Sequence, residues 1–206
     1  MHGFFVSFEG IDGAGKSTQI ALAAEHLKSK QRTCVLTREP GGTALGENLR
    51  SLLLEANSPI HPETEALLMF AARRQHIEEV IRPTLASGKW VLSDRFADAS
   101  FAYQGGGRGV KEETLRQLEN LVCANLRPDL TLLFDLQPDL GRERVALGKS
   151  PDRFERENAD FFARVRQAYL KRAHAEPGRI VIIDATRTVR QIQEEIGAQI
   201  DSLCKY

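Results

Sequence analysis

Short, almost continuously apolar runs alternate along this chain with longer segments whose apolar residues recur every three or four positions. The apolar runs cover residues 4–8, 33–37, 90–93, 130–135 and 180–184. Runs this short and uniform predict β-strands covered on both faces. The spacing in residues 161–169 and 189–203 predicts amphipathic helices.

Regular alternation of strands and helices predicts an α/β fold with a parallel sheet and right-handed crossovers. The 206 residues suffice for one substantial core, so we expect a single domain over residues 1–206. Ligands of such sheets collect beyond the carboxyl ends of the strands. Polar clusters do follow the strands: Glu9 with a glycine loop, "REPGGT" (38–43), "SDRF" (93–96), Asp135, and "DATR" (184–187).

The glycine loop "GIDGAGKS" (10–17) directly follows the first predicted strand and has the spacing G-x-x-x-x-G-K-[ST]. Gly13 and Gly15 allow successive N–H groups to point inward, and a helix beginning near Lys16 turns its positive end toward an anion. Lys16 would reach the β- and γ-phosphates, and Ser17 would ligate Mg²⁺. The predicted ATP cradle consists of Gly10, Ile11, Asp12, Gly13, Ala14, Gly15, Lys16, Ser17 and Thr18.

The cradle does not identify the phosphate acceptor, because GTPases, motor ATPases, transporters and small-molecule kinases share it. A guanine-nucleotide switch would carry an N/T-K-x-D sequence, and the chain has none. A motor ATPase would carry an acidic pair after a second strand to activate water. The best acid there is Asp94, and its basic neighbour Arg95 suits a second anion better than it suits water activation.

The loops after the second and third strands carry further phosphate-binding residue types. Asp94 is a candidate Mg²⁺ partner, and Arg95 and Arg38 are candidate phosphate clamps, because a guanidinium group binds phosphate through two hydrogen bonds. For Asp94 and Arg95 the alternative is a surface ion pair between the two, which their place after a buried strand disfavours. Thr43 is a good N-cap for the next helix.

Two segments offer side chains suited to a nucleoside. In "MFAARRQH" (69–76), Phe70 and Arg73 can share a helix face and meet a nucleobase, although on this segment alone a core Phe beside a solvated Arg is favoured. His76 has no visible partner. In "SFAYQGGGRGV" (100–110), three side chains could contact a base and sugar, and the glycines permit close approach, a hinge or a mere flexible connector. Those three are Ser100, Tyr103 and Gln104.

The segment "LGKSPDRFERE" (147–157) is predicted to be a basic, mobile flap between two helices. An arginine that closes over a phosphoryl-transfer transition state would stabilise its charge. A solvated basic helix face explains the same residues equally well.

The amino-acid composition indicates which partners and which cellular compartment to expect. Lys plus Arg (28) equals Asp plus Glu (28), so no global field attracts nucleic acid or an anionic membrane. The three scattered cysteines are typical of free thiols in a reducing compartment. No apolar run reaches the length of a membrane span, and no basic leader precedes a long apolar stretch. We therefore expect a cytoplasmic protein.

Taken together, the motifs resemble those of bacterial thymidylate kinase over nearly the whole chain. The resemblance is carried, in order, by "FEGIDGAGKST", "REPGGT", "FAARRQ", "DRF", "AYQGGGRG" and "DRFERE". It implies a P-loop nucleoside monophosphate kinase fold, in which a five-stranded parallel sheet is flanked by helices. It also implies a short mobile lid over about residues 142–157.

The resemblance further implies transfer of the γ-phosphoryl group of ATP to dTMP, giving dTDP and ADP in the pathway to dTTP, with Mg²⁺. Family members are homodimers, and no nucleic-acid or membrane partner is implied. Two alternatives stay open: a kinase for another nucleoside monophosphate or deoxynucleoside, and a non-catalytic nucleotide-binding regulator.

By resemblance, Phe70 stacks on thymine, Arg73 binds its carbonyl edge, and Tyr103 crowds the ribose 2′ position. The whole implied dTMP site is Asp12, Arg38, Pro40, Phe70, Arg73, Arg95, Ser100, Tyr103 and Gln104. The implied catalytic residues are Lys16, Asp94, Arg95 and Arg153; Arg142 and Arg187 lie on the adenine side; and the metal candidates are Ser17, Asp94 and Glu155.

The cradle itself contains no basic residue between Gly10 and Gly15. Members of the subclass with lid arginines share this feature. The resemblance therefore implies that the catalytic cation comes from the lid, with Arg153 the first choice and Arg156 and Lys149 the alternatives.

Overall fold

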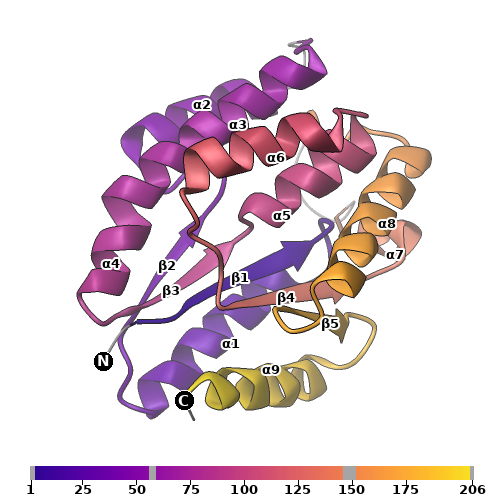
Figure 1. Cartoon of the computed structure of the whole chain (residues 1–206). Coiled ribbons are helices and arrows are strands. Elements are labelled where there is room, and N and C mark those ends of the chain that lie inside the picture. Colours follow the sequence, from indigo (N-terminus) through magenta and orange to yellow (C-terminus); the bar gives the residue numbers. More distant parts are fainter. Residues whose placement is uncertain (1–2, 56–58, 146–151, 205–206) are drawn as a thin grey trace.

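The middle layer of the protein is a parallel β-sheet of five strands, seen in a computed structural model that describes residues 3–55, 59–145 and 152–204 (Figure 1). The strands are β1 Phe5–Gly10, β2 Cys34–Arg38, β3 Trp90–Asp94, β4 Leu130–Asp135 and β5 Ile180–Asp184. Their order across the sheet is β2-β3-β1-β4-β5, with every neighbouring pair parallel. The predicted fold class and strand count are confirmed over the described residues.

The central position of β1 decides where the polar loops meet. Gly10 pairs with Phe134 of β4, and Phe8 pairs with Asp94 of β3. Asp94 in turn lies opposite Arg38 of β2. Strands β1, β2 and β3 run one or two residues further than the apolar runs predicted, because a paired backbone does not require an apolar side chain. These polar strand ends gather at one edge of the sheet.

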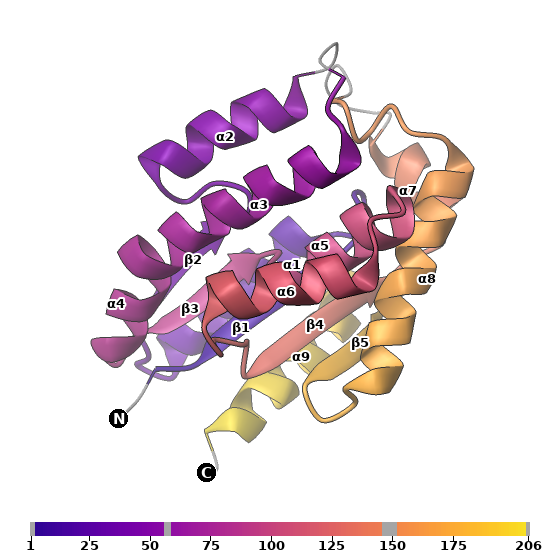
Figure 2. The same cartoon turned by 45° about the horizontal axis from the view of Figure 1, so that its top comes forward.

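Helices cover both faces of the sheet (Figures 1 and 2). The helices and π-helical turns are α1 Lys16–Ser29, α2 Ala44–Leu54, α3 Pro62–His76, η1 Ile77–Ile81, α4 Arg82–Ala86, α5 Ala97–Ser100, η2 Phe101–Gly107, α6 Glu112–Cys123, α7 Pro138–Val145, α8 Ala159–Ala175 and α9 Val189–Leu203. Helices α1 and α9 lie on one face, whereas α3, α5, α6 and α8 lie on the other. Helix α2 packs outside α3. Among the described residues, no helix is long and apolar enough to cross a membrane.

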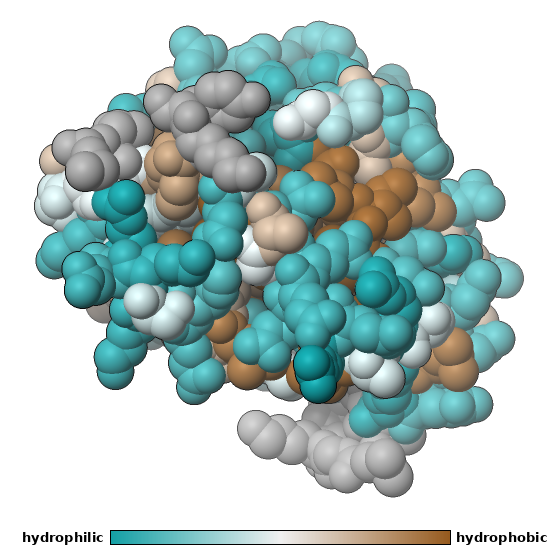
Figure 3. All heavy atoms as spheres, turned by 90° about the horizontal axis from the view of Figure 1, so that it is seen from below, coloured by the Kyte–Doolittle hydropathy of each residue, from teal (hydrophilic) through white to brown (hydrophobic). Residues whose placement is uncertain are grey.

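The strand sequences are mostly apolar because the three central strands are buried, whereas the edge strands β2 and β5 are only partly buried. Every residue of β1 is buried. On one face Phe5 meets the edge of the Phe96 ring, with centroids 4.9 Å apart, and on the other Phe8 stacks with Phe134 at 6.1 Å. The surface seen from below, on the side of α1 and α9, is in contrast largely hydrophilic (Figure 3).

Helix α2 begins where the sequence predicts. The Thr43 hydroxyl accepts a hydrogen bond from the Gly46 N–H at 3.0 Å, as an N-cap does. The Thr43 side chain therefore defines the residue at which the loop after β2 ends and α2 begins.

The alternative of a flexible connector at residues 100–110 is wrong, because η2 is a continuous turn of helix packed on α8. The glycines allow this close approach. A Cβ atom added to Gly106 would lie 2.6 Å from the Ala168 Cβ and 2.9 Å from the Arg164 carbonyl oxygen. A Cβ on Gly107 would lie 2.4 Å from the ring of Phe161, which is fully buried.

We expect Gly106→Ala to lower the free energy of unfolding by about 1–3 kcal/mol, because neither a backbone carbonyl nor a Cβ can rotate away from the added methyl group. Urea unfolding followed by circular dichroism measures the change. Gly105→Ala is the matched control, since its Cβ would meet only the terminal Cδ1 of Leu115 at 3.1 Å and the Val110 carbonyl oxygen at an ordinary contact distance of 3.9 Å. Equal losses in the two variants would contradict the close-packing explanation.

Candidate active site

The predicted phosphate cradle is present at the end of β1. Gly10, Gly13 and Gly15 have φ angles of 132°, 79° and 86°, a region that only glycine adopts readily. Helix α1 starts at Lys16, and Gly15 provides no side chain to cap its first turn. The free N–H groups of that turn, together with the positive end of the helix dipole, form a site for an anion.

The Lys16 ammonium group is held inside the cradle. It donates hydrogen bonds to the carbonyl oxygens of Gly10 at 3.2 Å and Ile11 at 3.1 Å. Burial, followed by the positive charge of Arg95, lowers its pKa below the ordinary value for lysine. A phosphate anion between these cations would relieve both effects, so the cradle is electrostatically prepared for one.

Arg95 lies between the cradle and a neighbouring pocket. Its φ angle of 73° is uncommon for a residue other than glycine. One terminal nitrogen donates to the Gly10 carbonyl oxygen at 2.9 Å, and the other pairs with the Asp12 carboxylate at 2.7 Å. The guanidinium carbon also sits 4.7 Å from the centre of the Tyr103 ring. Four separate contacts and constraints therefore fix this cation.

Asp12 is the anion at the junction of cradle and pocket. Burial by itself would raise the pKa of its carboxyl group, but the charges of Arg95 and Lys16 outweigh burial and hold that pKa below its ordinary value. Its carboxylate is 3.9 Å from the Lys16 ammonium nitrogen. The negative charge of Asp12 therefore offsets the repulsion between Lys16 and Arg95.

The pocket beside the cradle has an empty volume of about 620 Å³, including its open mouth. Its walls come from the cradle, the loop after β2, α2, α3, the segment after β3, and the residues just after 151. The lining residues are Asp12, Glu39, Pro40, Arg50, Leu54, Met69, Arg73, Arg95, Phe96, Ala99, Ser100, Tyr103, Gln104, Asp152 and Phe154. Seven of the nine predicted dTMP-site residues line this pocket, and the exceptions are Arg38 and Phe70.

Polar atoms in the pocket wall lack partners among the described residues. Arg73 donates from Nε to Glu39 at 2.7 Å and from Nη2 to Ser100 at 3.0 Å, but its buried Nη1 has no hydrogen-bond partner. The buried Tyr103 hydroxyl also has none, and burial raises its pKa above the ordinary value. Because buried polar groups are normally paired, these atoms indicate a polar ligand.

His76 has partners, so the expectation that it has none is wrong. Its Nδ1 lies 2.8 Å from Oε1 of Glu39, and its Nε2 lies 2.7 Å from the Thr37 hydroxyl. Glu39 in turn orients Arg73 at the pocket. These contacts join residues 34 to 39 positions apart, so no local pattern in the sequence could reveal them.

Arg38 and Phe70 lie just outside the pocket lining. The half-exposed Arg38 side chain pairs with Glu47 at 2.8 Å. Phe70 is buried, and the guanidinium carbon of Arg73 lies 4.5 Å from its ring centre. The pocket is lined instead by Arg50, which donates to the Pro40 carbonyl oxygen at 3.0 Å. Arg50 lies within a helix and belongs to no motif, so the sequence analysis missed it.

Arg153 is bonded to the pocket wall. It contacts the Glu65 carboxylate at 2.7 Å and the Leu53 carbonyl oxygen at 2.8 Å, and its guanidinium carbon lies 4.6 Å from the centre of the Phe154 ring. Glu155 accepts a hydrogen bond from the Asp152 N–H at 3.0 Å. Of the two alternative lid cations, Arg156 lies among the described residues and Lys149 lies outside them.

On the other side of the cradle, Arg144 joins the cradle to the loop after β5. It donates to the carbonyl oxygens of Gly13 at 3.2 Å and Ala185 at 3.3 Å. The predicted Arg142 is exposed on α7, and Arg187 pairs with Glu195 at 2.6 Å. The sequence "GRER" contains both arginines of α7, but only the structure shows that Arg144 contacts the cradle and that Arg142 is exposed.

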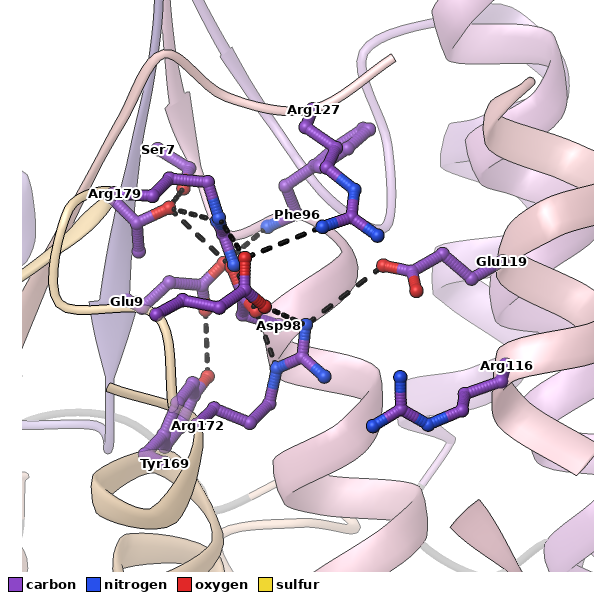
Figure 4. A network of polar contacts seen from close by, with 12 residues as sticks. Ser7, Glu9, Phe96, Asp98, Arg116, Glu119, Arg127, Tyr169, Arg172 and Arg179 are labelled. Atoms are coloured by element: carbon purple, nitrogen blue, oxygen red, sulfur yellow. Dashed lines mark hydrogen bonds and ion pairs between the residues drawn. The ribbon is translucent and has the colours of Figure 1, made fainter. Parts of the chain in front are cut away.

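Glu9 at the end of β1 is a buried carboxyl group (Figure 4). It accepts hydrogen bonds from the Phe96 N–H at 2.7 Å and the Tyr169 hydroxyl at 2.8 Å. Burial and the neighbouring Asp98 carboxylate raise its pKa to about 8. By fixing Phe96, Glu9 helps to hold the adjacent Arg95 in its left-handed backbone conformation. This role of Glu9 was not predicted from the sequence, although Glu9 is the second residue of the first motif, "FEGIDGAGKST".

Asp98 lies behind Glu9 in the same network, where α8 meets the sheet (Figure 4). It is paired with Arg172 at 2.5 Å and Arg179 at 2.7 Å. Burial would raise its pKa, but these two arginines lower it below the ordinary value. The pKa of Asp98, which forms two ion pairs with arginines, and the pKa of Glu9, which accepts hydrogen bonds from uncharged groups, therefore shift in opposite directions.

A parallel sheet with a triphosphate cradle and an adjoining pocket rich in hydrogen-bond donors defines a P-loop kinase of the nucleoside monophosphate class. A family model described as thymidylate kinase matches residues 8–196. The thymidylate kinase of Ralstonia nicotianae is 55% identical over 98% of this chain and 100% of its own length. That of Cupriavidus necator is 56% identical over 95% of this chain and 97% of its own length.

The solved structures agree. The crystal structure of thymidylate kinase from Ehrlichia chaffeensis matches with a TM-score of 0.79 at 34% identity, covering 97% of this chain and 99% of that one. This chain belongs to the thymidylate kinase family. The family resemblance found in the sequence is therefore confirmed.

The raised pKa of Glu9 predicts a pH-dependent stability. Between about pH 4.5 and about pH 8 the folded protein keeps a proton on Glu9 that the unfolded chain has lost. The free energy of unfolding contributed by this group therefore falls as the pH rises through this range, and it levels off above about pH 8. Glu9→Gln, which is neutral at every pH, is expected to remove that fall in thermal or urea unfolding series.

Glu47→Gln is the control for this series, because the carboxyl of Glu47 is exposed and Arg38 lowers its pKa. Its stability should follow the slope of the unaltered protein over the same range. Unfolding curves for Glu9→Gln that run parallel to those of the unaltered protein would disprove the assignment of the slope to Glu9.

Proposed function

We propose that this protein transfers the γ-phosphoryl group of ATP to dTMP, giving dTDP and ADP, on the route to dTTP. The proposal is supported by membership of the thymidylate kinase family. The structural observation that carries it is the pocket, which is lined by the cradle residue Asp12 and by Arg95, whose guanidinium group is bonded to the cradle. A monophosphate held there lies next to the place where a triphosphate binds.

On the acceptor side, the base lies at the end of the pocket that holds Arg73, Ser100 and Gln104. The dTMP phosphate lies at the end that holds Arg95 and Arg50. Tyr103, between the two ends, faces the sugar and crowds the ribose 2′ position. Phe70 as the thymine platform and Arg38 as a phosphate ligand stay predictions.

On the donor side, the N–H groups of the cradle and the buried Lys16 hold the β- and γ-phosphates. Fixed cations in this position stabilise the charge that develops on the transferred phosphoryl group, and they need no rearrangement at the moment of transfer. Arg142 and Arg187 flank the adenine side, and Arg144 supports the cradle there.

Mg²⁺ fits the residues at the strand ends. Oδ1 of Asp94 is buried and has no hydrogen-bond partner among the described residues, and Ser17 stands exposed in the first turn of α1. The described residues contain no group of three or more His, Cys, Asp or Glu side chains placed to hold a metal ion, as befits an ion bound largely by phosphate oxygens. Ser17 and Asp94, with Glu155 from the lid, would hold Mg²⁺, which when bound neutralises phosphate charge and orients the γ-phosphoryl group.

We also propose one domain over residues 1–206, with a mobile lid at about 142–157, and a cytoplasmic homodimer without nucleic-acid or membrane partners. Helices α2, α3 and α6 lie side by side (Figure 2). Exposed leucines point outward from them: Leu67 is 55% exposed and Leu121 is 76% exposed. A second copy of the chain would cover these residues, as apolar surface favours.

The test of the proposed function is ADP release from ATP with Mg²⁺ and a panel of acceptors: dTMP, dUMP, dCMP and dAMP. We expect dTMP to react with the highest kcat/KM. Equal turnover of dCMP or dAMP would assign another nucleoside monophosphate kinase. Absence of acceptor-dependent ADP release would favour a nucleotide-binding regulator.

We expect Arg50→Met to raise the KM for dTMP about 10- to 100-fold, as loss of a charged hydrogen bond to phosphate does, because Arg50 lines the pocket. Arg38→Met is the matched comparison, since Arg38 pairs with Glu47 outside the lining. Steady-state kinetics with varied dTMP measures both. A larger rise in KM for Arg38→Met would instead identify Arg38 as the residue that binds the dTMP phosphate, as the sequence predicts.

Arg153→Ala is expected to lower kcat by more than tenfold with little change in the KM for dTMP, as loss of a transition-state contact does. This role requires Arg153 to exchange its contacts with Glu65 and Leu53 for the γ-phosphate. A rise in the KM for dTMP at constant kcat would mean that Arg153 only anchors the lid to the pocket wall, and the catalytic cation would then be Arg156 or Lys149.

A further inference from the structure

Glu65 is a fully buried carboxylate on α3, directly behind the pocket. Three side chains bind it. Gln104 donates from Nε2 to Oε1 at 2.8 Å, Arg108 donates from Nε to Oε2 at 3.2 Å, and Arg153 reaches Oε2 at 2.7 Å. Gln104 lines the pocket and Glu65 does not. Glu65 therefore contacts a pocket residue from outside the pocket lining.

The contact with Glu65 determines which way the Gln104 amide is turned. A carboxylate bound by two guanidinium groups accepts hydrogen bonds and donates none. The amide must therefore direct its NH₂ group at Glu65, because its carbonyl oxygen would meet a second oxygen there. The carbonyl oxygen is then the part of the amide left to accept a hydrogen bond from a ligand. Gln104 is 1% exposed, so it has no solvent to compensate for the opposite orientation.

The same pocket wall also presents a donor. The buried Nη1 of Arg73 has no hydrogen-bond partner, while Glu39, Phe96 and Ser100 hold the rest of the guanidinium group. An acceptor next to a donor complements the imide edge of thymine or uracil, which has an N3–H donor beside the O4 acceptor. Cytosine has the reverse pattern, an N3 acceptor beside an amino donor. Its acceptor would face the Gln104 carbonyl oxygen and its donor would face the Arg73 N–H, so neither hydrogen bond could form.

We propose that Glu65 is a specificity-determining positioning residue. By fixing the Gln104 amide, it makes the pocket select a base with an N3–H group over cytosine. This inference rests on the proposed dTMP kinase function. Glu65 acts through Gln104, and Arg108 and Arg153 keep the buried carboxylate paired, which a charge with no exposure to solvent requires.

The test is Glu65→Gln, which preserves size but offers an NH₂ group to Gln104. The Gln104 amide then turns over and presents its own NH₂ to the base. We expect the ratio of kcat/KM for dTMP to that for dCMP to fall at least about tenfold, as expected when a buried donor loses its acceptor. The ratio for dTMP to dUMP is expected to stay unchanged, because these bases share the imide edge and differ only in the 5-methyl group.

Glu157→Gln is the matched control. Glu157 pairs with the other side of Arg108 at 2.5 Å, so this variant removes a carboxylate from the same network and leaves the Gln104 contact intact. Its dTMP-to-dCMP ratio should equal that of the unaltered enzyme. An unchanged ratio in Glu65→Gln, whatever the loss of kcat, would overturn the proposal. Failure of the unaltered enzyme to prefer dTMP over dCMP would instead reject the proposed function.

A measurement on the unaltered protein covers the case in which Glu65→Gln does not fold. In protein carrying ¹⁵N in the glutamine side chains, the Gln104 NH₂ signals are assigned by their loss in Gln104→Met. We expect one of these protons to lie downfield and to exchange slowly with water, as a proton bonded to a buried carboxylate does. An NH₂ pair with ordinary shifts and fast exchange would contradict a fixed amide.

Discussion

The pairing of β1 with β3 on one side and β4 on the other is the constraint on which the site depends. It places Gly10 and the cradle at the centre of the sheet edge, next to Asp94 and the backbone of Arg95. The carboxyl ends of parallel strands all lie at one edge of a sheet, and for this reason the loops after β1, β2 and β3 lie close together. This central position restricts the sequence of β1, because every residue of the strand is buried and neither face tolerates a solvated side chain.

At that edge, positive side chains are held in place by carboxylates before any ligand arrives, and two of these carboxylates, Glu39 and Glu65, are buried. Asp12 holds Arg95 at 2.7 Å, Glu39 holds Arg73 at 2.7 Å, and Glu65 holds Arg153 at 2.7 Å. Each pairing lowers the cost of burying a charge and also removes rotational freedom from a long side chain. For Arg95 and Arg73, the binding energy of a ligand is therefore not used to order the side chain, which is the physical meaning of a preorganised site. Arg153, in its proposed catalytic role, first has to leave Glu65.

Much of this arrangement could be predicted from the sequence, because it depends on local patterns. Apolar periodicity located all five strands, and the glycine spacing located the cradle and the start of α1. The supporting residues could not be found in this way. His76 and Glu39 meet across 37 positions, and Arg50 points into the pocket from an unremarkable helix. Such contacts are set by how helices pack on the sheet, which single-sequence periodicity does not encode. The glycines after Gln104 were ambiguous for the same reason, because only the neighbouring α8 shows that they serve close packing.

The two halves of the site differ in how firmly they are built. The acceptor pocket is lined by buried groups with partners on several elements, so its shape and hydrogen-bond pattern are set by the fold. The residues proposed for the donor side, Ser17, Arg142 and Arg187, are exposed, and solvent competes for their contacts. Screening and side-chain entropy weaken exposed charges, whereas buried donors and acceptors penalise every mismatch. Discrimination between substrates should therefore be strongest for the acceptor base and weakest for the adenine end of the donor.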